Sequence, residues 1–106
     1  MIFARVVGSV VSTNKDERLV GKKLLLVQPV ELGGAEKGAP LVAIDAVGAG
    51  YGEFVLLVQG SSARQTSMTE GQPVDCTICA IVDTVEQNGK TVFAKAKDPD
   101  YSGGRV

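Results

Sequence analysis

The sequence predicts an all-β fold, a small five-stranded β-barrel that is OB-like (of the oligonucleotide-binding type), with one short helix and a C-terminal β-hairpin. Three observations support this class. The 106 residues include 13 glycines and no tryptophan, which favours tight turns between short strands. Apolar and β-branched residues occur in short runs between glycines, prolines and charged loops. Asn88-Gly89 is a strong signal for a two-residue hairpin turn.

The apolar runs place the strands. We expect strands at residues 2–11, 23–30, 41–47, 53–59 and 76–86, and a final strand at 91–96 that completes the hairpin. Gly8 marks a bend or bulge in the first strand. Loops are expected at 12–22, 33–40 and 48–52, where polar residues or glycines gather. Ser61 or Ser62 can cap a short helix that runs to about Ser67.

A chain of this length forms one domain. We assign residues 1–97 to the barrel domain and residues 98–106, which contain Pro99, Gly103 and Gly104, to a C-terminal tail. The tail is expected to be loose, or to become ordered only on a neighbouring molecule. Because so short a chain buries only about two-thirds of its surface on folding, its stability is expected to be modest unless subunits associate.

The charges and the N-terminus exclude several classes of protein. The 11 basic and 12 acidic residues give a net charge of -1 and are scattered along the chain, so nucleic acid is not expected as a partner. Arg5 interrupts the apolar N-terminus, which argues against a signal peptide. No segment approaches the roughly 20 apolar residues that span a bilayer. We therefore expect no membrane association and a cytosolic location.

The segment Cys76-Thr77-Ile78-Cys79 has the spacing of redox and zinc motifs. On a strand, residues three apart point to opposite faces, so the two sulfurs cannot share a metal or form a disulfide without a bulge or a helical turn. A zinc site would also need two further ligands, and the chain has no histidine and no third cysteine. We expect two free structural cysteines, no metal and no cofactor.

Ser61 and Ser62 look like a nucleophile pair, but the chain has no histidine to serve as their base. Gln65 follows Ser62 by three residues, a capping-box pattern that favours a helix cap. Arg64, in the same segment, is either solvated or paired with a carboxylate of the same or an adjacent subunit. We expect no catalytic residue here.

Three aspartates, Asp45, Asp75 and Asp83, interrupt otherwise apolar strands, where a charge needs a partner or a place at a strand end. Asp45 and Asp75 are the candidate partners of Arg64. Catalysis would require two carboxylates to meet across a cleft. Pairing between subunits or hydrogen bonding at the strand ends is favoured over catalysis, so the chain is not expected to be an enzyme.

Residues 43–64 join two apolar strands through Gly48-Ala49-Gly50-Tyr51-Gly52 and end in Gly60-Ser61-Ser62-Ala63-Arg64. This segment resembles the EutN/CcmL family, small pentameric proteins that close the vertices of bacterial microcompartment shells. The resemblance extends to residues 8–13 and 22–29 upstream and to residues 73–75 and 81–83 downstream. Within the family, the turn and the Gly-Ser-Ser-Ala-Arg segment are more similar to the metabolosome branch than to the carboxysome branch.

The resemblance implies a structural function: a homopentamer at the corners of a microcompartment shell in the bacterial cytoplasm, in contact with hexameric shell proteins. It also implies that Ala49, Gly50, Tyr51 and Gly52 approach the five-fold axis, where only small residues let five copies converge. Gly50 is expected to have a positive φ. The alternative is a plain structural turn. A phosphate-binding loop is disfavoured because a strand, and no helix, follows the turn.

Two other functions are weighed against the shell protein. One is an OB-like module that binds single-stranded nucleic acid or another ligand, for which a basic groove and stacked aromatic rings are typical. The chain is slightly acidic and has five aromatic residues. The other is a small hydrolase or metal enzyme, which the absence of histidine and of a metal-ligand set disfavours.

Overall fold

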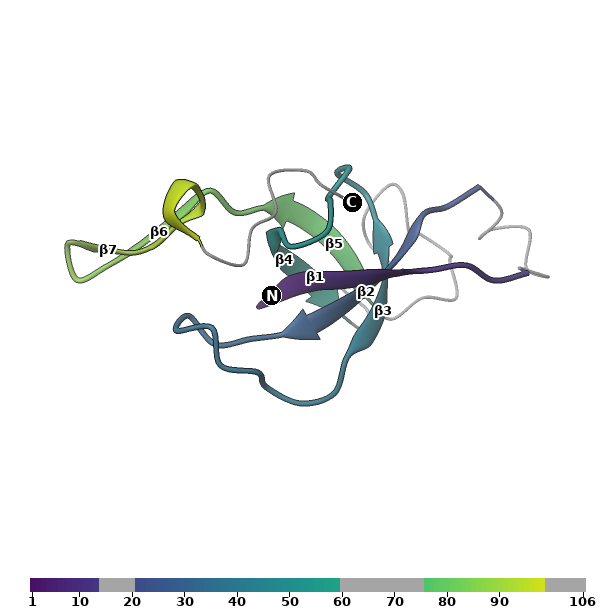
Figure 1. The fold of residues 1–106 in the computed structure, drawn as a ribbon, viewed down its shortest axis with the longest axis horizontal. Helices are drawn as coiled ribbons and strands as arrows, with labels where there is room; N and C mark the ends of the chain where they lie inside the picture. The colour runs from purple at the N-terminus through teal and green to yellow at the C-terminus, as the bar shows by residue number, and fades with distance from the viewer. Residues whose placement is uncertain (14–20, 60–75, 99–106) are drawn as a thin grey trace.

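The computed structural model describes residues 1–13, 21–59 and 76–98. Its centre is a closed barrel of five strands in the order β1-β2-β3-β5-β4, with β4 pairing back to β1 (Figure 1). The strands are β1 (Ile2–Val10), β2 (Leu24–Pro29), β3 (Leu41–Asp45), β4 (Phe54–Gln59) and β5 (Cys76–Ile81). Neighbouring strands are antiparallel except β3 and β5, which are parallel. The predicted all-β barrel is confirmed.

One apolar core fills the barrel. Its buried members come from all five strands and from the turn before β4; they are Ala4, Val6, Leu25, Val27, Ala43, Ala49, Val55, Leu57, Cys76 and Ile78. Most are small or β-branched, because inward side chains from opposite walls of a narrow barrel must fit into the same space. Outward residues alternate with them along each strand.

Two β-bulges bend the barrel wall. The pairing of β1 with β2 shifts between Val6 and Gly8, which leaves Val7 as an extra residue. The bulge expected at Gly8 is therefore confirmed. A second shift, between β4 and β5, leaves Cys79 without a direct partner across the strands. Bulges of this kind increase the local twist and help a short strand to follow the curvature of a barrel.

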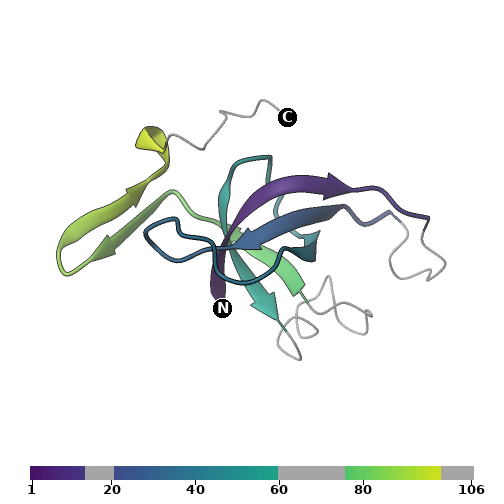
Figure 2. The ribbon, with the colours of Figure 1, turned by 60° about the horizontal axis from the view of Figure 1, so that its bottom comes forward.

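A β-hairpin leaves the barrel after β5. Its strands β6 (Thr84–Gln87) and β7 (Lys90–Ala94) form a separate two-stranded sheet that projects from one end of the barrel (Figures 1 and 2). Asn88 and Gly89 connect them, with φ of 55° and 78°, as a type I′ turn requires. The predicted hairpin is confirmed.

The strand expected at 76–86 is in fact two strands. The chain leaves the barrel at Val82 and Asp83, between β5 and β6. Val82 donates its N–H to the carbonyl of Phe54 at 2.8 Å, and Asp83 accepts the N–H of Lys95 at 2.8 Å. The first bond continues the pairing of β5 with β4 by one residue, and the second extends the pairing of β6 with β7, so the chain passes from the barrel to the hairpin between Val82 and Asp83. A continuous apolar run does not reveal this change of partner strand.

The remaining segments agree in part with the sequence. The loop expected at 33–40 lies between β2 and β3, and its Gly34 and Gly38 have positive φ. The helix expected from Ser61 or Ser62 to Ser67 lies outside the described residues. In the part of the chain that the structure describes, the helical element is the 3-10 helix η3 (Lys95–Lys97), which the sequence did not predict. No helix in these ranges is long and apolar enough to span a membrane.

Candidate functional site

The turn between β3 and β4 is held by the carboxylate of Asp45. Its Oδ1 accepts backbone N–H groups from Val47, Gly48 and Ala49 at 3.1, 3.0 and 3.1 Å. Asp45 is 7% exposed. Asp45 therefore forms hydrogen bonds at a strand end, which is one of the two alternatives expected for the strand aspartates. Its alternative partner Arg64 lies outside the described residues.

The glycines of this turn have different conformations. Gly48 and Gly52 have positive φ, 77° and 83°, where a side chain would be strained. Gly50 does not, which corrects the expectation for that residue. Its N–H donates instead to Oε1 of Glu53 at 2.8 Å. A Cβ placed on Gly50 would lie 3.6 Å from the same Oε1, an ordinary contact.

The four residues expected near a five-fold axis are exposed to different degrees. Ala49 is 1% exposed, with its methyl group in the barrel core. Gly52 is buried and Gly50 is half-buried. Tyr51 is 45% exposed. The methyl group of Ala49 therefore packs into the barrel, and Gly50 and Tyr51 form the accessible part of the turn.

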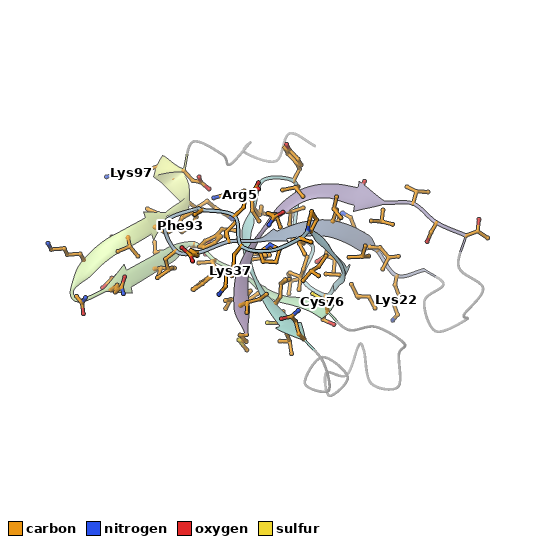
Figure 3. The ribbon with its side chains drawn as sticks, turned by 90° about the horizontal axis from the view of Figure 1, so that it is seen from below. Arg5, Lys22, Lys37, Cys76, Phe93 and Lys97 are labelled. Atoms are coloured by element: carbon orange, nitrogen blue, oxygen red, sulfur yellow. The ribbon has the colours of Figure 1, made fainter. Side chains whose placement is uncertain are left out.

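Two charged residues flank the turn. Arg5 donates from Nη1 to the carbonyl of Gly52 at 2.8 Å and to Oδ2 of Asp98 at 2.7 Å. Glu53, whose Oε1 accepts from the turn, also pairs through Oε2 with Nζ of Lys95 at 2.6 Å. Figure 3 shows Arg5 between the barrel and the base of the hairpin. These pairs were not predicted from the sequence; a lone charge in an apolar strand, such as Arg5, was the available signal.

Asp98 was assigned to the loose C-terminal tail, and the structure corrects this for that residue. Its carboxylate is 4% exposed and pairs with Arg5. A buried charge is costly unless it is paired, so the position of Asp98 is fixed by its partner.

A second apolar cluster joins the hairpin to the barrel. Phe54 stacks on Phe3, with ring centroids 5.1 Å apart, and contacts Phe93 of β7 at 4.4 Å. The buried members of the cluster are Val30, Phe54 and Val82. Phe54 is 2% exposed and contacts both other rings, so it is not free to stack on nucleic-acid bases. Of the aromatic residues that the structure describes, Tyr51 is the exposed one.

The two cysteines have different environments. Cys76 is 3% exposed in the barrel core. Cys79 occupies the bulge of β5, and its Sγ donates to the carbonyl of Leu56 at 3.5 Å. The strand predicted here is confirmed, and it carries a bulge at Cys79. Among the described residues, no three acidic or cysteine side chains gather as a metal-binding group.

Four predicted site residues, Ser61, Ser62, Arg64 and Asp75, lie outside the described residues.

The fold and the turn define a class of protein: a small closed β-barrel whose buried charges bind its own backbone and the base of its hairpin. The sequence model of the EutN/CcmL family, described as "Ethanolamine utilisation protein EutN/carboxysome", matches residues 1–83. The chain belongs to this family. The match ends one residue before β6 begins.

Relatives on both branches of the family are similar along nearly their whole length. The bacterial microcompartment shell vertex protein EutN of Salmonella typhimurium is 47% identical over 95 residues, 90% of this chain and 96% of its own. The carboxysome shell vertex protein CcmL of Gloeobacter violaceus is 42% identical over 99 residues, 90% of this chain and 95% of its own.

Solved structures share the fold. The structure of Gloeobacter violaceus CcmL has a TM-score of 0.84 at 40% identity and covers 92% of this chain and all of its own. The pentameric microcompartment shell protein GrpN of Rhodospirillum rubrum has a TM-score of 0.73 at 44% identity, covering 82% and 99%.

Proposed function

We propose that this chain is a structural shell protein whose homopentamers cap the vertices of a bacterial microcompartment. One observation carries the proposal: the chain matches vertex proteins over nine-tenths of its length at more than 40% identity, and the fold of CcmL superposes with a TM-score of 0.84. The relative GrpN, described as pentameric, supports five copies for the assembly.

The outer wall of the barrel offers an apolar surface for a neighbouring subunit. Gly8 pairs with Leu26, and Leu26 pairs with Val42, so these residues form one row across β1, β2 and β3, which we call the outer row. Val42 is 48% exposed. Exposed apolar surface that runs across several strands is typical of a protein interface. This row supports association of the subunits.

For the turn before β4, we propose a position near the five-fold axis. Gly50 and Tyr51 are its accessible residues, and Gly50 leaves room for the close approach of five backbones. A small residue at an axis matters because any side chain there is repeated in every subunit.

The proposed function needs no catalysis. Flat facets made of six-fold units cannot close a shell, so five-fold units with a matching edge must occupy its corners. The contacts required are hydrogen bonds and packing at protein interfaces. The partners are then further copies of this chain and hexameric shell proteins, with neither a nucleic acid nor a cofactor.

An OB-like module for single-stranded nucleic acid is the second candidate. It is disfavoured because Phe3, Phe54 and Phe93 pack together and because the net charge is -1, whereas such modules use free rings and a basic groove. A labelled oligonucleotide tests it. Salt-dependent binding at micromolar protein would favour this candidate over the shell protein.

Two experiments test the vertex function. Native mass spectrometry of the purified protein should give five copies; a stable monomer at micromolar concentration would contradict the proposal, and a hexamer would contradict the vertex position. In a deletion strain without a second vertex gene, electron microscopy should show elongated or open shells with cargo inside and unchanged cargo activity in extracts. Normal closed shells together with the loss of one enzymatic step would favour an enzyme instead.

A further inference from the structure

The hairpin of β6 and β7 has no strand pairing with the barrel. An isolated two-stranded hairpin is marginally stable in water, so its position depends on the contacts at its base. The contact of Phe93 with Phe54 is one of them, with the centroids 4.4 Å apart. Apolar packing is largely non-directional, and it does not by itself fix the direction in which the hairpin points.

Two ion pairs supply that direction. Arg5 in β1 pairs with Asp98, which follows η3, at 2.7 Å. Glu53, just before β4, pairs with Lys95 of η3 at 2.6 Å. The barrel contributes the cation to the first pair and the anion to the second. A slipped docking would therefore bring like charges together, Arg5 with Lys95 or Glu53 with Asp98, and such contacts are costly when desolvated.

The barrel members of both pairs also hold the turn before β4. Arg5 donates to the carbonyl of Gly52 at 2.8 Å, and Glu53 accepts the N–H of Gly50 at 2.8 Å. Each of these side chains thus bridges a backbone group of the turn and a charge beside the hairpin. The four side chains are between 4% and 22% exposed, so solvent screens them only weakly.

We propose that Arg5, Glu53, Lys95 and Asp98 form a clamp that fixes the hairpin and the turn before β4 as one unit. Arg5 and Glu53 are its positioning residues. A change at Lys95 is then transmitted through Glu53 to the N–H of Gly50. The clamp lies within one subunit and does not depend on the proposed function. In a pentamer it would set the direction of the hairpin relative to the turn.

The test compares two lysines of η3. Lys95 belongs to the clamp, whereas Lys97 is exposed and extends away from the barrel (Figure 3). Residue-resolved hydrogen exchange follows the N–H of Gly50 in the turn and the N–H of Val82, which bonds to the carbonyl of Phe54 at the base of the hairpin. Lys95→Met should speed exchange of both N–H groups about five- to tenfold, since it removes a charge-assisted hydrogen bond. Lys97→Met should change neither.

Exchange at Gly50 that stays unchanged in Lys95→Met, or that rises equally in Lys97→Met, would overturn the proposal. A second variant covers the case in which Lys95→Met folds poorly. The triple variant Glu53→Lys, Lys95→Glu and Asp83→Asn restores opposite charges but leaves the Gly50 N–H without its acceptor. Asp83→Asn is included because Oδ1 of Asp83 lies 3.4 Å from Nζ of Lys95 and would repel a glutamate at position 95. In this variant the N–H of Val82 should exchange at its native rate, whereas the N–H of Gly50 should still exchange fast. Fast exchange at Val82, with native circular dichroism, would overturn the proposal as well.

Discussion

Arg5 and Asp98, 93 residues apart in the sequence, form an ion pair in which Nη1 and Oδ2 are 2.7 Å apart. The carboxylate is 4% exposed and the guanidinium 16%. The guanidinium also lies over the ring of Phe54, with Cζ 5.7 Å from the centroid. This pair therefore joins the first strand to the segment after the hairpin, and it does so next to the aromatic contact that attaches the hairpin.

Asp98→Asn should destabilise the subunit. The change keeps the shape of the side chain but leaves the partly buried charge of Arg5 without its counterion, and breaking such a pair costs about 1 to 3 kcal/mol of the free energy of unfolding. Urea unfolding at equal protein concentration measures this loss.

The matched control is Asp83→Asn. The Asp83 carboxylate also lies near a lysine, with Oδ1 3.4 Å from Nζ of Lys95, but it is 79% exposed. Solvent screens this pair, and its loss should cost less than about 1 kcal/mol. An equal loss of unfolding free energy in the two variants would mean that the buried Arg5–Asp98 pair stabilises the subunit no more than the exposed Lys95–Asp83 pair.

Asp45→Ala should loosen the turn before β4. It removes the acceptor of three N–H groups, and hydrogen bonds to a charged group contribute about 1.5 to 3 kcal/mol each when they are not replaced by water. We expect a clear drop in the melting temperature.

Asp45→Asn should cost less, because the amide oxygen still accepts while the charge is gone. Thermal unfolding followed by circular dichroism tests whether the melting temperature of Asp45→Asn lies above that of Asp45→Ala. An Asp45→Ala variant as stable as the wild type would show that water replaces the carboxylate.

The barrel could be predicted because the sequence signals that indicate its strands and turns are local. Short apolar runs, turn glycines and Asn88-Gly89 each act over a few residues. The break between β5 and β6 was missed because it depends on a change of partner: Val82 still bonds to Phe54 of β4, whereas Asp83 bonds to Lys95 beyond β7. No pattern within the run from Cys76 to Glu86 marks such a long-range bond.

The candidate site was predicted less completely for the same reason. The glycine-rich turn was found, but the sequence did not indicate that the methyl group of Ala49 lies in the core. The turn consists of small residues, which can face either the core or the solvent. The three hydrogen bonds to Asp45 hold the turn in the conformation that places Ala49 inward. Arg5 and Glu53 were missed because their partners lie more than 40 residues away.

Cys76 and Cys79 should both be free thiols in the native protein. One lies in the barrel core and the other bonds to the carbonyl of Leu56 outside it, so their sulfurs lie in different environments. Thiol counting on freshly prepared protein, denatured without reductant, should give two per chain. An intramolecular disulfide would mean that β5 rearranges and would reopen the redox interpretation.

Gly50→Val tests whether the turn lies at the five-fold axis. The residue has no positive φ, and a Cβ would lie 3.6 Å from Oε1 of Glu53, so the subunit should fold with little strain. At the axis, however, the branched side chain would occur five times in one narrow space. We expect native circular dichroism together with loss of the pentamer in native mass spectrometry.

Gly33→Val is the matched control for Gly50→Val. Gly33 also lacks a positive φ, and nothing lies within 4 Å of a Cβ placed there, so the same substitution adds the same side chain in a loop that is not proposed to approach the axis. This variant should remain pentameric. A pentamer retained in both variants would identify the turn before β4 as a peripheral turn, and loss of the pentamer in both would place the loop at Gly33 in a subunit contact as well.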